Sequence, residues 1–373
     1  MTVRALDTLV RRLATARDSA VAEANVQADI RTLLLQGELN LEDGQLVELE
    51  VQAGSGRRID IEVGSTVIET KRDLRKSGVR TDAEKQLAGY VRTRSEQVQA
   101  RYVGILTDGA EWGLYHLERD GDFRVVSEFA LSGTNPDRSA LLVWLESALA
   151  TVEHIQPTPR EVERRLGAQS SAHALDFADL KDLYLANREI PSVRLKRQLW
   201  AKLLTTAFGT GFRDEDDLFV EHTLLVVTAE IIAHSVVGLA PEQLSPASLL
   251  SGQQFVSAGI TGVIEEDFFD WLIEVEGGDR FVRDLARRLC RFAWHAVEHD
   301  VVGAGLHAAR IGRQARQVFL ARRGERMVQR VPPLLVGVPF EQREVGDPEQ
   351  LPAIRGDEIP LLRHGETQLA EDL

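Results

Sequence analysis

The sequence has almost no cysteine and no export signal. A single cysteine, Cys290, in 373 residues excludes a disulfide within the chain and a zinc site built from several thiolates. The first 18 residues interleave arginine with leucine and valine, and so lack the continuous apolar block of a signal peptide. We therefore expect a protein of the reducing cytoplasm.

Long apolar runs and nucleotide-binding loops are scarce too. The most apolar stretch, residues 223–240, contains Glu230 and His234, and each of these side chains is costly in hydrocarbon. We therefore predict a buried helix there and no membrane partner. No glycine-rich phosphate cradle or Walker pattern occurs, so no ATP site is expected.

A positive net charge is also missing, since 44 basic and 58 acidic residues give a net charge of -14. This total argues against indiscriminate binding of polyanions but leaves room for local basic patches. Residues 57–101 hold eleven Lys or Arg against seven Asp or Glu, and residues 306–330 hold seven Arg and one Glu. Residues 341–373, by contrast, hold three Arg and nine acids. The charge is therefore divided by segment.

Apolar periodicity predicts two folded domains. Residues 3–36 show helical spacing, whereas residues 46–129 alternate with a period of two in five runs, interrupted by a helical stretch at 81–94. This pattern predicts an α/β domain at 1–152 with a mixed sheet flanked by helices, closed by a helix at about 139–154. After the proline-containing linker 155–161, the periodic segments are helical, which predicts an all-α domain at 156–306. Residues 307–373 form an Arg-rich and then proline- and acid-rich tail, which we expect to be poorly ordered.

The most informative segment is residues 57–71, in which Gly64-Ser65 joins two alternating runs as a type II′ hairpin. Paired residue numbers then sum to 129, so Asp60 is predicted to face Glu69. The same alternation sends Ile59 to the apolar face together with Ile61, Val63 and Ile68. The other face would carry Arg58, Asp60, Glu62, Glu69 and Lys71.

Opposed carboxylates destabilise a strand pair unless a cation lies between them. Hard carboxylate oxygens suit Mg²⁺ or Mn²⁺, which retains waters that can attack a phosphodiester. Lys71 would lie beside Asp60 and Glu69, where its ammonium can polarise the attacking water and neutralise charge in the transition state. The alternative is a solvated hairpin face on which charges alternate without a function.

Basic and polar residues follow the hairpin. Arg72, Arg75, Lys76 and Arg80 would form a rim that can hold a phosphate backbone together with Arg58. Gln86 and Tyr90 lie one helical turn apart and so share a helix face, although an exposed amide above a packed ring has the same spacing. Glu23, on the early helix, could add a third oxygen ligand or be an ordinary surface acid.

The residues in this region resemble the PD-(D/E)XK nuclease fold, and more narrowly the N-terminal nuclease region of single-chain restriction-modification enzymes of types IIG and ISP. The stretches that carry the resemblance are Arg58-Ile-Asp60, Ile68-Glu69-Thr-Lys71, Gln86-Leu87-Ala-Gly-Tyr90 and Gly104-Ile-Leu-Thr107-Asp-Gly109 with Trp112 and Tyr115. The helical half is similar to the connector of that family at Leu218-Phe219-Val-Glu-His222, Phe255, Gly259-Ile260-Thr-Gly262 and Glu266-Asp-Phe-Phe-Asp270-Trp271. The resemblance covers about residues 15–305.

The resemblance implies a Mg²⁺-dependent DNA endonuclease of a restriction-modification or related phage-defence system, acting on double-stranded DNA. It makes Asp60 and Glu69 metal ligands, Lys71 the catalytic lysine, Glu23 an accessory acid, and Gln86 a residue near the scissile phosphate or base. The family continues into a methyltransferase, but no S-adenosylmethionine loop or Asn-Pro-Pro-Tyr-like motif follows here. The chain would then be a truncated or split form whose methyltransferase and specificity parts belong to a separate chain, or a catalytically idle DNA- or protein-binding remnant.

One rival motif lies near the end of the helical segment. His295-Ala-Val-Glu298-His299 fits the H-x-x-E-H pattern of inverted zinc peptidases, in which both imidazoles share one helix face. A helix surface with two histidines has the same pattern, so a zinc peptidase is the remote alternative.

Overall fold

The computed structural model describes residues 3–19, 21–39, 41, 48–53, 57–132, 135–208, 212–257 and 268–296, without the side chains of 48–53 and 57–58. The chain divides into two compact units, Met1–Gly337 and Val338–Leu373, and the second lies wholly outside these residues. The Arg-rich stretch and the acidic tail, residues 307–373, also lie outside the described residues.

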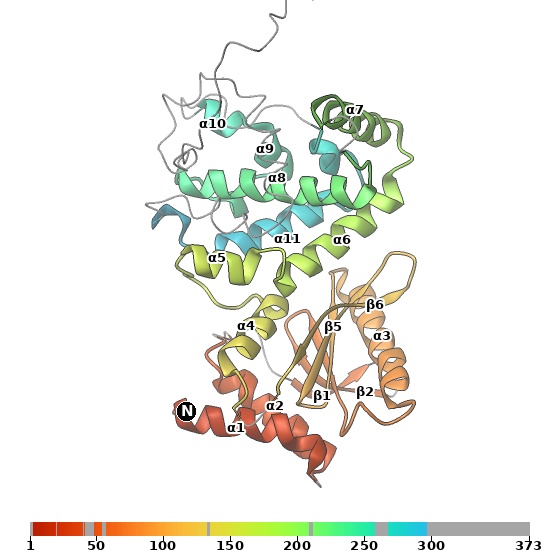
Figure 1. Ribbon diagram of the computed structural model, residues 1–373, viewed down its shortest axis with the longest axis vertical. Coiled ribbons are helices and arrows are strands. Elements are labelled where there is room, and N and C mark those ends of the chain that lie inside the picture. The colour runs from red at the N-terminus through yellow and green to blue at the C-terminus, as the bar shows by residue number, and fades with distance from the viewer. Residues whose placement is uncertain are drawn as a thin grey trace, which may run out of the picture. The chain divides into compact units, whose positions relative to one another are not determined.

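The first half of the described chain is built around a mixed six-stranded sheet in the order β1-β2-β3-β4-β5-β6 (Figure 1). Strands β3 and β4 are parallel and are joined by helix α3 (Val79–Val98), whereas all other neighbours are antiparallel. The strands are β1 (Glu48–Ala53), β2 (Arg57–Val63), β3 (Thr66–Thr70), β4 (Val103–Thr107), β5 (Glu111–Leu117) and β6 (Phe123–Ala130). A mixed sheet flanked by helices is what the periodicity predicts.

The β2–β3 hairpin has the predicted register. Val63 pairs with Thr66, and Ile61 pairs with Ile68. Gly64 has a φ of 54°, while Ser65 does not have a positive φ, as a type II′ turn requires. The turn chemistry therefore sets which residues of β2 and β3 face one another.

Helices cover both faces of this sheet. Helices α1 (Val3–Thr15), α2 (Glu23–Gln36) and α4 (Arg138–Leu149) pack on one face, where Ile61 and Ile68 are buried. Helix α3 packs on the other face against Val67 and Leu106 (Figure 1). The prediction for Ile59 is wrong, because this side chain packs in the α3 cluster and not with Ile61. The alternation of β2 is thus interrupted at Asp60, between the two isoleucines.

Strand β6 is not among the five predicted runs. A bulge between Leu114 and Tyr115 shifts the β5–β6 register, so that Leu114 pairs with Ser127 while Tyr115 pairs with Val125. The skipped residue, Val126, breaks the alternation that identifies a strand in the sequence. Most of the strand is also partly or fully exposed, which further weakens the apolar signal.

The second half of the described chain is helical, as predicted. Its helices often begin at a capping side chain, as when Ser170 accepts a hydrogen bond from the backbone N–H of His173. The α-helices are α5 (Pro159–Leu166), α6 (Ser171–Asn187), α7 (Pro191–Phe208), α8 (Asp216–Val236), α9 (Pro246–Ser251), α10 (Gln253–Ser257) and α11 (Gly278–Cys290). Short 3₁₀ turns lie at Pro241–Gln243, Asp270–Glu274 and Trp294–Ala296.

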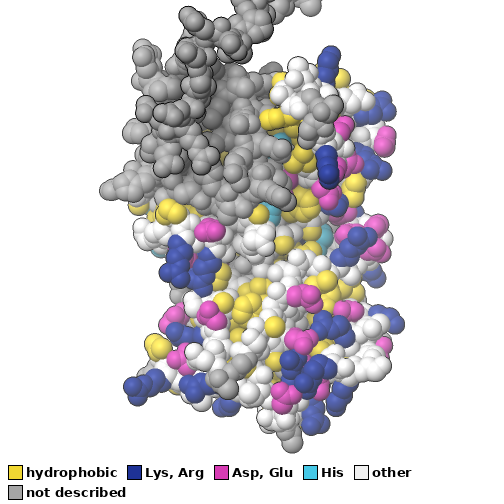
Figure 2. All heavy atoms as spheres, in the orientation of Figure 1, with side chains coloured by type: hydrophobic (Ala, Val, Ile, Leu, Met, Phe, Trp, Pro, Cys, Tyr) yellow, Lys and Arg dark blue, Asp and Glu magenta, His cyan; other side chains and the backbone are white. Residues whose placement is uncertain are grey.

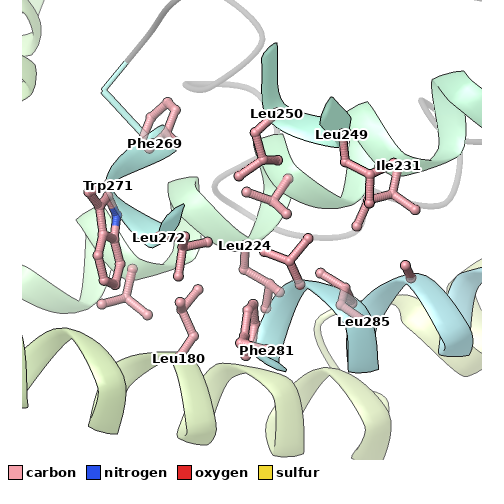
Figure 3. Packing of buried hydrophobic residues seen from close by; sticks show 14 of the residues in the cluster. Leu180, Leu224, Ile231, Leu249, Leu250, Phe269, Trp271, Leu272, Phe281 and Leu285 are labelled. Carbon is pink, nitrogen blue, oxygen red and sulfur yellow. The ribbon is translucent and has the colours of Figure 1, made fainter. Parts of the chain in front are cut away.

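The helical half has its own apolar core, in which Leu180, Leu224, Trp271 and Phe281 converge from four segments (Figure 3). Leu175 of α6 is the link to the neighbouring core, because it packs in the cluster under α1, α2 and α4. The two cores otherwise separate near residue 150, close to the predicted linker.

Helix α8 corresponds to the most apolar stretch of the sequence. By length and composition it could cross a membrane, but 56% of its most apolar window is buried inside the protein. Phe219, Val227 and Ile231 are completely buried, and His222 and His234 are at most 3% exposed. The helix is therefore a core element, as its internal polar residues predict.

Candidate active site

Asp60 lies on β2 where the β2–β3 ladder ends. Its Oδ2 accepts hydrogen bonds from the backbone N–H and the hydroxyl of Thr70, both at 2.8 Å. Its backbone carbonyl accepts a third hydrogen bond, also 2.8 Å, from the side-chain amide of Gln27 on α2. The predicted ladder pair of Asp60 with Glu69 is thus replaced by a side-chain bond that ties Asp60 to the end of β3.

Glu69, on β3, is a completely buried acid with an incomplete set of partners. Its Oε1 accepts a hydrogen bond from Nζ of Lys71, while its Oε2 is buried and has no hydrogen-bond partner. Burial, and secondly the charge of Asp60, raises the pKa of Glu69 from 4.5 to about 7, although Lys71 opposes the shift. The carboxylate therefore lies in a position that a further positive charge would stabilise.

Lys71 follows β3 directly and is held by the neighbouring strand, since its backbone N–H donates to the carbonyl of Thr107 at 2.9 Å. Burial alone would lower the pKa of Lys71, but the hydrogen bond and charge of Glu69 outweigh burial and raise it. The charges of Glu23 and Asp60 act in the same direction. Lys71 therefore keeps its proton at neutral pH.

Glu23 reaches the same place from the first turn of α2. Its Oε2 accepts a hydrogen bond of 3.0 Å from the backbone N–H of Arg72, and its charge raises the pKa values of both Glu69 and Lys71. The fold thus brings together Asp60, Glu69, Lys71 and Glu23 from three elements, although Glu23 itself is exposed.

The residue that orders the loop after Lys71 is Asp108, a completely buried acid that the sequence analysis did not single out as a site residue. Its two oxygens accept hydrogen bonds from the backbone N–H groups of Leu74, Ala110 and Glu111 at 2.8–3.1 Å. Asp108 thereby fixes the β4–β5 turn and the chain beyond Lys71 at the same time. The signal available in the sequence was the turn motif Thr107-Asp-Gly109.

The chemistry of these acidic residues suits a divalent cation, whereas the distances between them suit one only in part. Their oxygens are hard ligands, and the unpartnered Oε2 of Glu69 is a position that a cation would satisfy. Among the described residues, one group of three acids has its oxygens all within 4.8 Å of one another, and that group is Glu118, Asp120 and Asp122. Asp60, Glu69 and Glu23 do not form such a group among the described residues.

Two residues of the predicted basic rim are occupied by internal ion pairs. Arg75 pairs with Asp73 and Asp18 at 2.9 Å, and Arg80 pairs with Glu111 at 2.6 Å. Arg72 and Lys76 are exposed, and the side chain of Arg58 lies outside the described part of the chain. Among the described residues on the face shown in Figure 2, basic and acidic side chains are interspersed.

Gln86 and Tyr90 do share a face of α3, as their spacing predicts. The side-chain amide of Gln86 donates to the hydroxyl of Tyr90 at 2.8 Å. Tyr90 is 3% exposed and packs in the cluster between α3 and the sheet. This geometry is an amide above a packed ring, and no described contact joins Gln86 to Asp60 or Glu69.

The histidine motif is only partly described. His295 lies in the 3₁₀ turn Trp294–Ala296, whereas Glu298 and His299 lie outside the described residues. Comparison of the chain with protein-family models, with curated proteins and with solved structures finds no match.

Proposed function

We propose that this chain is a Mg²⁺-dependent DNA endonuclease with a restriction-endonuclease-like α/β domain, working in the cytoplasm in a restriction-modification or related phage-defence system. The observation that carries the proposal is the buried carboxylate of Glu69, whose Oε2 lacks a partner, beside Asp60 and Lys71. A buried carboxylate with an unpartnered oxygen and a raised pKa is costly to keep charged, and a cation at Oε2 of Glu69 would offset that cost.

The arrangement along the chain supports this function further. Asp60 and Glu69 lie on the two strands of one hairpin, and Lys71 follows two residues after Glu69 at the end of β3. These are the residue types and the spacing that carry the resemblance to the PD-(D/E)XK nucleases. The helical half would be the connector, and a separate methyltransferase or specificity chain would supply the DNA target.

Each residue would have a distinct part in hydrolysis. Asp60 and Glu69 would hold Mg²⁺ or Mn²⁺, and Glu23 would contact the ion through a water molecule. The bound ion would supply a water of lowered pKa and would stabilise negative charge at the phosphate. Lys71 keeps its proton, so it would donate to the attacking water or to a phosphate oxygen and would not act as the base. Asp108 would hold the loop that positions Lys71.

A DNA-cleavage assay tests this proposal. The purified full chain, incubated with supercoiled plasmid and Mg²⁺, should nick or cut the DNA, and EDTA should stop the reaction. Asp60→Asn and Lys71→Met should each lower the rate by about 10²-fold or more, because each removes a group acting directly at the reacting phosphate. Glu118→Gln is the matched control, since it neutralises an acid in the separate cluster with Asp120 and Asp122.

The second candidate is a catalytically idle DNA- or protein-binding remnant. One observation favours it: Arg75 and Arg80, which should contact the phosphate backbone, are already paired with acids. Calorimetry separates the two functions. Mg²⁺ binding that depends on Asp60 and Glu69, without cleavage in the presence of any tested DNA, would support the remnant, whereas unchanged cleavage by Asp60→Asn and Lys71→Met would exclude the proposed active site.

A further inference from the structure

A cavity lies where the sheet meets the helical half, away from the candidate active site. Its volume is about 170 Å³, and it is lined by residues from α3 and the loop before β4, from the end of β5 and the loop after it, and from α6 and α11. The side chains that matter are Arg101, His116, Arg119, Asp179, Asp182 and Arg280. The candidate active site lies at the other end of β4, near Thr107, about 13 Å along the strand at 3.3 Å per residue.

Two basic side chains in the cavity wall have polar atoms without partners. His116 is 3% exposed, and neither of its ring nitrogens makes a hydrogen bond within the described chain. Nε of Arg101 is likewise buried and has no hydrogen-bond partner. Each such atom is costly to bury, so the arrangement calls for a ligand that accepts hydrogen bonds.

The charges of the cavity leave an excess positive charge. Arg101 pairs with Asp179 at 3.0 Å, and Arg119 pairs with Asp182, whose oxygen also accepts from the backbone N–H of Arg119 at 2.9 Å. No ion pair among the described residues includes Arg280. With His116 neutral, three guanidiniums therefore face two carboxylates.

The surroundings also keep His116 neutral. Burial, and then the charge of Arg101, lowers the pKa of His116 to about 4, with smaller contributions from Arg119 and Arg280 and an opposing one from Asp179. A neutral imidazole presents one donor and one acceptor. It can therefore donate to an oxyanion while accepting from a protonated oxygen or a hydroxyl.

We propose that this cavity is a binding site for a small phosphate-bearing anion, held by Arg280, Arg119 and His116. A phosphate group offers several acceptor oxygens to donors that converge from different elements, and guanidinium is the side chain best suited to it. A ligand there would contact β5, α6 and α11 together, so it would fasten the α/β half to the helical half. This site does not depend on the proposed nuclease function.

Titration of the full chain with inorganic phosphate by calorimetry tests the proposal, with chloride at matched ionic strength as the reference. Ribose 5-phosphate is the second probe, because it distinguishes a site for free phosphate from a site for a phosphate ester. Arg280→Gln should weaken binding by about tenfold or more, the value of one charge-assisted hydrogen bond. Arg283→Gln is the matched control, because Arg283 is exposed on the same helix and does not line the cavity.

A second measurement reports on the cavity directly. A bound phosphate should raise the pKa of His116 above about 4, which histidine proton resonances can follow with and without phosphate. Equal affinities in wild type, Arg280→Gln and Arg283→Gln, or a His116 pKa unchanged at saturating phosphate, would overturn the proposal.

Discussion

At the scale of single residues, the buried carboxylate of Glu69 is the clearest case of a candidate site residue that lowers the stability of the folded protein. Its pKa is raised from 4.5 to about 7 when the protein folds. Below pH 4.5 the carboxyl is protonated in both the folded and the unfolded states, so its burial costs little. Between pH 4.5 and 7 the folded state binds more protons than the unfolded state, so stability falls as the pH rises.

We therefore expect Glu69→Gln to stabilise the metal-free protein at pH 8 while abolishing cleavage. The gain in unfolding free energy should be on the order of 3 kcal/mol, since each pKa unit corresponds to about 1.4 kcal/mol. Urea unfolding in EDTA at pH 4.5 and pH 8 measures it, and the gain should be small at the lower pH. A loss of stability at pH 8 would mean that the ion pair with Lys71 outweighs the cost of burial.

Glu62 is the matched control for this experiment. It is also a buried acid of the same sheet with an unpartnered Oε2, but its Oε1 accepts hydrogen bonds from two side chains, Arg94 at 2.7 Å and Tyr102 at 3.0 Å. Glu62→Gln should therefore destabilise the protein, because it leaves Arg94 with a weaker partner. Opposite signs for Glu62→Gln and Glu69→Gln would separate a structural acid from one kept for binding.

At the scale of elements, Asp108 links the loop after β3 to the β4–β5 turn, and the alternating pattern of the strands gives no sign of this link. Its carboxylate accepts three backbone N–H groups, from Leu74, Ala110 and Glu111. Asp108→Ala should cost about 3 kcal/mol or more, because these donors lose their partner inside the protein. Thermal unfolding measures the loss of stability. Asp137→Ala is the control, because it removes a single N-cap hydrogen bond, donated by the backbone N–H of Ala140, and should cost about 1 kcal/mol.

The loop bearing Lys71 provides a second measurement on Asp108. Hydrogen exchange of the Leu74 amide should become faster in Asp108→Ala, because the acceptor that protects it is gone. Protection of Leu74 that stays as in wild type would show that other contacts hold the loop, and Asp108 would then have no positioning role.

The same elements show how far the sequence determines the site. The alternating runs and the Gly64-Ser65 turn predict the β2–β3 register, because side-chain period and turn type are local properties. The side of the sheet on which Ile59 lies cannot be predicted in this way. It depends on the hydrogen bond that Asp60 accepts from Thr70, ten residues further along the chain. Strand β6 is missed for a similar reason, because its bulge is set by pairing with β5.

Ion pairing is harder still to predict from sequence. Arg75 and Arg80 are predicted to face a phosphate backbone, yet each finds an acid that lies far along the chain, Asp18 and Glu111 respectively. A charge count over residues 57–101 cannot include such partners. The residue types of the candidate site follow from the sequence, whereas the electrostatic balance around them depends on the tertiary fold.

At the scale of the whole described molecule, a buried ionic network joins the sheet half to the helical half. Glu146, near the end of α4, is 2% exposed and pairs with Arg291 and, at 2.9 Å, with Arg165. Burial lowers the pKa of Arg291 in spite of Glu146. Nearby, Arg288 donates to the carbonyl of Ser147 at 2.6 Å. Within this network one carboxylate satisfies two guanidiniums.

Removing that carboxylate should weaken the junction before either half. Glu146→Gln leaves Arg291 buried without a countercharge, which should cost about 3–5 kcal/mol. We expect calorimetry to show earlier unfolding, with one transition dividing into two as the halves uncouple. The double variant Glu146→Leu/Arg291→Leu should regain much of the loss, because it removes both charges from a buried site. If Glu146→Gln instead unfolds in one transition at the wild-type temperature, the Glu146 network does not hold the halves together, and other contacts must do so, among them Arg101 with Asp179 and Leu175 with the sheet's core.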